Sequence, residues 1–225
     1  MGAKVQLQWF WIGALAIMAL GVACSFGTPN EAGSASKHGS PPPHLIGFMG
    51  DSWACGGGLA LSVGPDGSYA AQTAKLLGSK YRISCAGGSG YVAPGDTVPF
   101  GDRVDDLLAG KPDVVIVQGS TNDYIASESE IESAAEDLFA RIRRALPNTR
   151  VFALGPAYTP DAPRALTDVA RAAIQAAADE SGVTWIDLAS TGWLDPAVDY
   201  ADGYHPNANG HRVLARHLAD ALSTD

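Results

Sequence analysis

The amino-acid sequence predicts an α/β protein in which helices cover both faces of a parallel β-sheet. Two observations support this fold class. Apolar runs of strand length alternate with segments whose apolar residues recur at helical spacing. The runs are also hydrophobic almost throughout, which is typical of strands that are buried on both faces. A three-layer α/β/α sandwich satisfies both observations.

Five apolar runs are the strand candidates. In chain order they are residues 44–50 (HLIGFMG), 81–87 (YRISCAG), 111–120 (KPDVVIVQGS), 149–158 (TRVFALGPAY) and 183–190 (VTWIDLAS). No internal repeat relates these runs to one another. They therefore predict one sheet in one domain, with helices in the intervening segments.

Three of the intervening or following segments carry a clear helical pattern. They are residues 128–146, 162–180 and about 208–222. In each, the apolar residues fall on one face at a spacing of three and four. The residues on these faces include Ile131, Leu138, Phe139 and Ile142 in the first helix, Val169, Ala173 and Ile174 in the second, and Leu214, Leu218 and Leu222 in the third.

The composition fits one globular domain, which we expect over residues 44–225. The chain has 225 residues, of which 46% are hydrophobic and 17% are charged, and this is enough length for a sizeable core. The formal net charge of −9 repels nucleic acid and anionic surfaces. We therefore expect no nucleic-acid partner, and we expect a monomer.

Residues 1–23 have the pattern of a secretory signal. Lys4 supplies a positive charge, and the uncharged run WFWIGALAIMALGVA follows it. The run ends at Cys24, and LGVAC resembles a bacterial lipobox, although Gly21 occupies the usual position of its leucine. The segment predicts a lipidated Cys24 that anchors the protein to a membrane. Simple secretion or an uncleaved anchor helix are the alternatives, and all three place the domain outside the cytoplasm.

Residues 24–43 predict a tether between this signal and the domain. They are rich in Gly, Ser and Pro and contain few apolar residues, so they cannot bury enough surface to fold. The prolines at 41–43 would stiffen the last step of the tether.

Polar residues capable of chemistry follow the predicted strands. Ser52 follows the first strand, GGSG (87–90) the second and GSTND (119–123) the third, while DGYHPN (202–207) precedes the last helix. In open parallel sheets, ligands bind outside the carboxyl ends of the strands. The four segments together contain a nucleophile, a base, an acid and candidate donors for an oxyanion, which is the set that ester hydrolysis through an acyl-enzyme requires.

The expected roles follow from the chemistry of each group. Ser52 is the candidate nucleophile, His205 the base that takes its proton, and Asp202 the carboxylate that orients His205. The backbone N–H groups of Ser52 and Gly90 and the side-chain amide of Asn122 are the candidate oxyanion hole. Each residue alone could be an ordinary turn or cap residue, so the prediction rests on the set.

The same segments resemble the conserved blocks of the SGNH, or GDSL-type, hydrolases. GDS, GGSG, GSTND and DGYHPN stand in the order of that family, and the resemblance covers residues 44–225. It implies a five-stranded, flavodoxin-like sheet, an esterase that works without a metal or organic cofactor, and the roles given above. Two positions depart from the family: Trp53 replaces a frequent leucine, and Cys85 replaces a frequent asparagine.

The family's strand order of 2-1-3-4-5 also suggests a disulfide. In that order Cys55, just beyond Ser52, and Cys85, at the end of the second strand, come from neighbouring strands. An extracytoplasmic location permits oxidation. The alternative is two reduced cysteines packed as small apolar residues.

Other classes of site fit less well. His205, His211, His217 and Asp202 suggest a metal site, but the chain lacks HExxH-like or Cys-rich ligand spacing, so we expect none. The glycines at 56–58 are not followed by the Lys-Ser or Lys-Thr of a phosphate loop. An α/β-hydrolase is disfavoured because no GxSxG elbow surrounds Ser52.

The sequence thus predicts an extracytoplasmic serine esterase for small or short-chain acyl esters, with acylated envelope glycans or lipids as the suggested substrates. Two alternatives remain open at this stage. The same fold could transfer the acyl group to a sugar hydroxyl, or it could bind a substrate without turnover.

Overall fold

A computed structural model of the chain describes residues 42–57 and 62–224. All described residues belong to one compact unit, His38–Asp225. The expected signal segment 1–23, the lipidation site Cys24 and nearly all of the tether 24–43 lie outside the described residues.

The sheet has five parallel strands in the order β2-β1-β3-β4-β5, so the predicted architecture is confirmed. The strands are β1 (Leu45–Gly50), β2 (Lys80–Cys85), β3 (Val114–Gln118), β4 (Arg150–Leu154) and β5 (Thr184–Ile186). Several are shorter than the apolar runs that predict them. In β3, for example, Pro112 lacks the N–H that a central strand must donate, and Gly119 leaves extended geometry with a φ of 138°.

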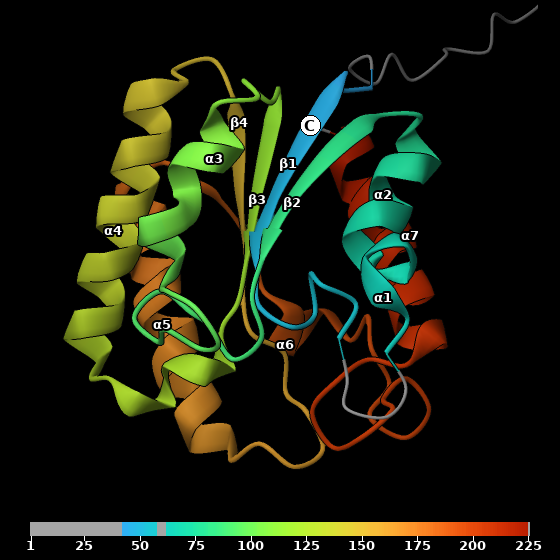
Figure 1. Ribbon diagram of the computed structural model, residues 1–225. Helices are drawn as coiled ribbons and strands as arrows, with labels where there is room; N and C mark the ends of the chain where they lie inside the picture. Colours follow the sequence, from blue (N-terminus) through green and yellow to red (C-terminus); the bar gives the residue numbers. More distant parts are fainter. Residues whose placement is uncertain (1–41, 58–61, 225) are drawn as a thin grey trace, which may run out of the picture. The chain divides into compact units, whose positions relative to one another are not determined.

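Helices cover both faces of the sheet (Figure 1). On one face lie α3 (Val104–Leu108), α4 (Glu128–Ala145) and α5 (Arg164–Glu180). On the other lie α2 (Tyr69–Leu77) and α7 (Ala208–Thr224). Shorter helical segments occupy the connections: α1 (Gly64–Gly67), η1 (Phe100–Arg103), η2 (Thr121–Ile125) and α6 (Leu188–Thr191).

The central strands β1, β3 and β4 bury side chains on both faces, whereas the edge strands β2 and β5 contain no fully buried residue. In β3, Val115 and Val117 belong to the core beneath α3, α4 and α5, whereas Val114 and Ile116 belong to the core beneath α2 and α7. Successive residues of a strand point to opposite faces, so an uninterrupted apolar run supplies both cores at once. This explains why the sequence reads as hydrophobic runs and not as an alternating pattern.

Helix ends follow the local chemistry of the chain. Ser127 and Glu130 form a reciprocal capping box at the start of α4. Pro163 is the N-cap of α5, so the helix begins two residues later than the pattern from 162 predicts. The sequence pattern missed α2, which starts at the Ser68 cap and ends at the left-handed Gly78.

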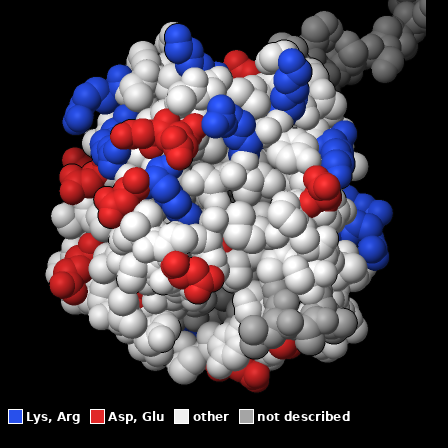
Figure 2. All heavy atoms as spheres, viewed as in Figure 1, with Lys and Arg blue, Asp and Glu red and all other residues white. Residues whose placement is uncertain are grey.

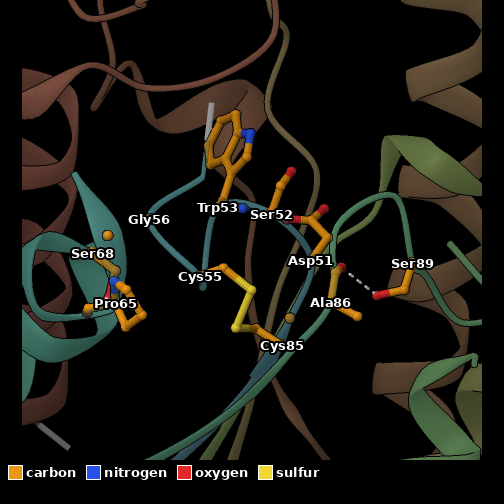
Figure 3. The surroundings of a disulfide bond; sticks show 12 residues. Asp51, Ser52, Trp53, Cys55, Gly56, Pro65, Ser68, Cys85, Ala86 and Ser89 are labelled. Carbon is orange, nitrogen blue, oxygen red and sulfur yellow. Dashed lines mark hydrogen bonds between the residues drawn. A yellow bond between two sulfur atoms is a disulfide. The ribbon is translucent and has the colours of Figure 1, made fainter. Parts of the chain in front are cut away.

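The predicted disulfide between Cys55 and Cys85 is confirmed, with the two Cα atoms 5.5 Å apart. Cys85 is paired in register with Gly50, the last residue of β1, so the bridge joins the loop after β1 to the end of the neighbouring strand (Figure 3).

No helix within 42–57 and 62–224 is both long enough and apolar enough to cross a membrane.

Candidate active site

The predicted catalytic segments meet at the carboxyl end of the sheet. Ser52 lies in the turn that follows β1, the segment 86–95 follows β2, and η2 with Asn122 follows β3. The fourth segment, DGYHPN (202–207), immediately precedes α7. The sheet order brings β1 between β2 and β3, which places the first three segments side by side.

Ser52, His205 and Asp202 form a continuous hydrogen-bonded chain. The Ser52 Oγ lies 3.0 Å from the His205 Nε2. The His205 Nδ1 lies 2.9 Å from the Asp202 Oδ1 and 3.0 Å from its Oδ2. An ionised carboxylate only accepts hydrogen bonds, so the Nδ1 carries a proton, which leaves the Nε2 of a neutral ring to accept the Ser52 hydroxyl. This is the protonation state that a general base needs.

Asp202 is held by its own turn. Its Oδ1 accepts hydrogen bonds from the backbone N–H groups of Tyr204, at 3.0 Å, and His205, at 2.8 Å. Partial burial raises the pKa of Asp202, but these two N–H groups and the His205 ring outweigh burial and hold the pKa below its usual value. The carboxylate therefore stays ionised beside the imidazole at neutral pH.

The nucleophile loop is compact because glycines allow close backbone approach. The Gly57 N–H donates to the Ser52 carbonyl at 2.7 Å, and a Cβ on Gly57 would come within 3.0 Å of that oxygen. Gly56 has a φ of 68°, in the left-handed region that favours glycine. Figure 3 shows the side chains of Ser52 and Trp53 extending from this loop away from the disulfide.

Of the expected oxyanion donors, the Ser52 N–H is free of any acceptor among the described residues. The Asn122 amide already has two acceptors, the Ser89 carbonyl at 3.0 Å and the Asp51 carboxylate at 3.3 Å. An Asn side chain has two N–H hydrogens, so Asn122 can donate to a substrate only by giving up one of these bonds. The longer bond to Asp51 is the weaker of the two.

Gly90 differs from the expectation. Its N–H donates to the Ala93 carbonyl at 2.9 Å, so this group is not free to bind an oxyanion in the structure. A Cβ at Gly90 would come within about 2.4 Å of the buried Asp123 carboxylate, so the position requires glycine for packing. The motif predicted a glycine at this position, but the structure requires glycine because the loop packs closely against Asp123.

The reasoning from sequence missed the role of Asp123, the last residue of GSTND. Its carboxylate is fully buried and accepts the backbone N–H groups of Tyr91, Val92 and Ala93 at 2.8–2.9 Å. Burial raises the pKa of Asp123, and the three N–H donors partly offset that effect. Asp123 thus fixes the loop after β2 against the segment that carries Asn122.

Asp51, the middle residue of GDS, has no chemical role predicted from the sequence beyond that of a turn residue holding the strand end, and it is buried beneath the nucleophile. It accepts hydrogen bonds from the Trp53 N–H at 2.9 Å, the Ser120 hydroxyl at 3.2 Å and the Asn122 amide. Burial raises the pKa of Asp51 to about 6 despite these donors. Its carboxylate connects the residue before Ser52 with the segment after β3.

Arg103 is a half-buried charge behind the site that no motif indicated. Its Nη2 donates to the Gly50 carbonyl at 2.7 Å and to the Ser89 hydroxyl at 2.9 Å, and the guanidinium lies over the Phe100 ring. Burial lowers the pKa of Arg103 to about 10, and the neighbouring Asp51 charge opposes the shift. The residue ties the ends of β1 and the loop after β2 together.

A cavity of about 370 Å³ adjoins Asn122 and Tyr204. Its lining carries no charged side chain and consists of Thr121, Asn122, Tyr124, Ala162, Pro163, Leu166, Thr167 and Tyr204. In the space-filling view, Lys and Arg gather at the end of the molecule where the strands begin (Figure 2). The uncharged lining suits an uncharged group held beside Asn122 and Tyr204.

In the part of the chain that the structure describes, no group of three or more His, Cys, Asp or Glu side chains could hold a metal ion. His211, one of the histidines considered above, is buried in α7 and accepts the Tyr69 N–H at its Nδ1. His217 is exposed and stacks on Trp193.

Comparison with known proteins shows the family of the chain. The sequence model of the GDSL-like Lipase/Acylhydrolase family matches residues 48–213. A GDSL lipase of Mycobacterium tuberculosis is 29% identical in an alignment that covers 80% of this chain and 82% of that protein. The segment that matches the family model contains all the catalytic residues predicted from the sequence.

Solved structures with the same fold include carbohydrate esterases. A family two carbohydrate esterase from Clostridium thermocellum, in complex with cellohexaose, superposes with a TM-score of 0.67 at 22% identity over 81% of this chain. This chain spans 64% of that esterase, less than two thirds of its length. Est24, a carbohydrate acetylesterase from Sinorhizobium meliloti, gives a TM-score of 0.67 at 17% identity and covers 80% of this chain and 98% of its own. The chain thus belongs to the GDSL-like lipase/acylhydrolase family and is a carboxylic-ester hydrolase.

Proposed function

We propose that the protein hydrolyses small or short-chain acyl esters through a covalent acyl-enzyme on Ser52. The observation that carries this proposal is the unbroken chain from the Ser52 Oγ through the His205 ring to the Asp202 carboxylate, with each link at 2.9–3.0 Å. This geometry lets one imidazole accept a proton while a fixed carboxylate stabilises the cation that forms.

In the acylation step, the Ser52 Oγ attacks the ester carbonyl carbon while the His205 Nε2 takes the hydroxyl proton. The carbonyl π electrons move to oxygen and give a tetrahedral oxyanion. When this intermediate collapses, the bond to the alcohol oxygen breaks, and His205 passes the proton to that oxygen. The products of this half-reaction are a free alcohol and an ester of Ser52.

In the deacylation step, water replaces the alcohol. His205 takes a proton from water as its oxygen bonds to the acyl carbon, and it then returns that proton to the Ser52 Oγ as the ester bond breaks. The free acid leaves and the starting state is restored. Acyl transfer to a sugar hydroxyl would differ only in the nucleophile of this second step.

For the oxyanion we propose two donors in place of the three expected from sequence. The Ser52 N–H has no competing acceptor among the described residues, and Asn122 can exchange its long bond to Asp51 for the substrate oxygen. Hydrogen bonds of this kind often tighten only when substrate is bound. Gly90 instead contributes to the site by leaving room for the Asp123 carboxylate, which holds the loop after β2.

The substrate proposal rests on the uncharged cavity beside Asn122. Tyr124 and Tyr204, which flank it, are 63% and 49% exposed and offer apolar faces with polar tips. A small acyl ester of a glycan or lipid fits such a surface, and the carbohydrate esterases of the same fold support the glycan version.

We also propose that the domain works outside the cytoplasm, attached through a lipid on Cys24 or secreted. The apolar run before Cys24 supports this location, as does the disulfide, because such bonds persist in oxidising compartments. Metabolic labelling with a radioactive fatty acid tests it: label is expected on the full chain and absent from Cys24→Ala. Absence of label from the wild type would contradict the lipid anchor and leave secretion or an uncleaved anchor helix.

The function is tested with a panel of nitrophenyl esters that runs from acetyl to long-chain. The wild-type full chain is compared with Ser52→Ala, His205→Ala and Asn122→Ala. Turnover should be highest for short acyl groups, fall by up to ~10⁶ in each of the first two variants, and fall by about 10² to 10³ in the third. A rate that increases steadily with the length of the acyl chain would contradict the substrate proposal. A wild type that hydrolyses no ester would contradict the proposed function itself.

A further inference from the structure

Trp53 is the side chain that joins the nucleophile loop to the segment of the general base. It follows Ser52 directly, and its indole N–H donates to the Tyr204 carbonyl at 3.0 Å. Tyr204 directly precedes His205. The indole is only 7% exposed and packs edge-on against Tyr200, with ring centroids 6.0 Å apart. One buried side chain thus contacts both catalytic segments.

Neither of these segments belongs to a strand or a helix. Ser52 lies in the turn between β1 and the residues before α1, and Asp202–His205 lies between α6 and α7. Their spacing is therefore not set by the hydrogen-bond ladder of the sheet. Among the described residues, two hydrogen bonds join 52–57 to 199–207: the catalytic bond between Ser52 and His205, and the bond from Trp53 to Tyr204.

These two bonds behave differently during the reaction on which this inference rests, the proposed acyl-enzyme cycle. In the free enzyme the Ser52 hydroxyl donates to the His205 Nε2 and helps to hold the ring. In the acyl-enzyme the Ser52 Oγ is an ester oxygen without a proton, so that bond no longer exists. The indole bond involves no reacting atom and remains available throughout the cycle.

We propose that Trp53 is a positioning residue for deacylation, which keeps His205 in place to activate water while Ser52 carries the acyl group. Before acylation, the Ser52–His205 hydrogen bond still holds the two segments together if the indole bond is lost. After acylation it is the remaining direct hydrogen bond between the two segments within the described part of the chain. Removing the indole N–H should therefore slow the second step more than the first.

The experiment compares Trp53→Phe with the wild type, using nitrophenyl acetate in a stopped-flow instrument. Phenylalanine keeps an aromatic ring against Tyr200 but cannot donate to the Tyr204 carbonyl. The fast phase of nitrophenol release reports acylation and the steady phase reports deacylation, each normalised to sites titrated with a serine-directed phosphonate. This normalisation removes any misfolded fraction from both rates.

The matched control is Trp185→Phe. The Trp185 indole nitrogen is buried and has no hydrogen-bond partner among the described residues, so this variant removes the same atoms without removing a hydrogen bond. Trp53→Leu, the residue frequent in the family, is the second variant. It removes the ring contact as well as the N–H.

We expect Trp53→Phe to lower the deacylation rate by about fivefold to tenfold, the effect of one hydrogen bond, while the acylation rate stays within about twofold. The acyl-enzyme should then accumulate and appear as a larger burst. Trp53→Leu should lower deacylation at least as much, and Trp185→Phe should change neither rate by more than about twofold.

Equal losses in both steps, or no loss in either, would overturn the positioning role while leaving the esterase proposal intact. A wild-type chain without any turnover or phosphonate labelling would instead contradict the proposed function, and the role of Trp53 with it. The two failures are therefore distinguishable in one experiment.

Discussion

Asp202 reaches His205 from only three positions earlier in the chain, and two backbone N–H groups of the same turn hold its carboxylate. The acid and base of the site are thus one local unit, and Ser52 is the member that tertiary structure must bring to them. This division explains which parts of the site the sequence could predict. A turn with Asp and His at fixed spacing is a local property of the chain, whereas the distance to Ser52 depends on the sheet.

The oxyanion donors show the limit of prediction at this scale. The motif singles out Gly90 and Asn122, but whether an N–H is free depends on every acceptor around it. Gly90 donates to Ala93, and Asn122 donates to Ser89 and Asp51. Asp51 and Asp123 likewise belong to the motifs, but the motifs do not show which groups their carboxylates bind. Only the folded loops show that they accept hydrogen bonds from backbone and side-chain donors across the site.

Asp202→Asn should lower the rate of ester hydrolysis by about 10³ to 10⁴ while leaving the fold intact. The amide cannot stabilise an imidazolium, and it allows the wrong tautomer of His205. The check is kcat for nitrophenyl acetate together with the circular dichroism spectrum. A variant that keeps more than about a tenth of the wild-type rate would show that Asp202 does not orient the base.

The pH dependence of the wild type has a defined direction. The pKa of Asp202 lies below its usual value, so the carboxylate stays ionised and can orient the base. A general base must be free to accept a proton, so the rate should rise from acid to neutral pH. The measurement is kcat/KM between about pH 5 and 8, checked against phosphonate labelling. A rate that falls over this interval would mean that His205 is not the base.

The elements themselves differ in how readily they can be predicted. The buried strands and the long helices α4, α5 and α7 carry periodic apolar residues, so their existence follows from the sequence. The short helix α2 does not, because the Gly, Pro and Ser residues before it resemble a loop and its buried face is mostly alanine. The lengths of the strands also could not be predicted, because pairing with neighbours decides where each strand ends.

The disulfide is the element-scale feature with the clearest energetic consequence. It closes a loop with a sequence separation of 30 residues, and the chain-entropy model assigns such a loop on the order of 3 to 4 kcal/mol. Cys55→Ser/Cys85→Ser should lower the free energy of unfolding by about that amount in urea titrations. Because Cys55 lies close to Ser52, kcat should fall too; unchanged stability and unchanged kcat would contradict both expectations.

At the scale of the whole molecule, two buried groups oppose each other in the dependence of stability on pH. Burial, and to a lesser degree the charge of His205, lower the pKa of His211 from 6.5 to about 4, so its contribution is present above pH 6.5 and is lost as pH falls toward 4. Burial raises the pKa of Asp51 from 3.8 to about 6, so its contribution is present at low pH and is lost as pH rises through that interval. The two effects act in opposite directions between pH 4 and 6.

The substitution His211→Asn should separate the effect of His211 on stability from that of Asp51. The Asn oxygen can still accept the Tyr69 N–H that now binds the His211 Nδ1, but the side chain does not titrate. From pH 7 to pH 4 the wild type should lose roughly 3 kcal/mol of stability relative to this variant. Urea unfolding at several pH values measures the difference, with the exposed His217→Asn on the same helix as the control. A difference that does not change with pH would contradict the account of His211.

The account as a whole depends on Ser52 being a nucleophile that His205 activates. The most direct measurement treats the wild type, Ser52→Ala and His205→Ala with a serine-directed phosphonate and locates the adduct by peptide mass spectrometry. The account predicts one adduct per wild-type chain, on Ser52, none in Ser52→Ala, and labelling slowed by orders of magnitude in His205→Ala. An adduct on another residue, or ester hydrolysis that persists in Ser52→Ala, would contradict it.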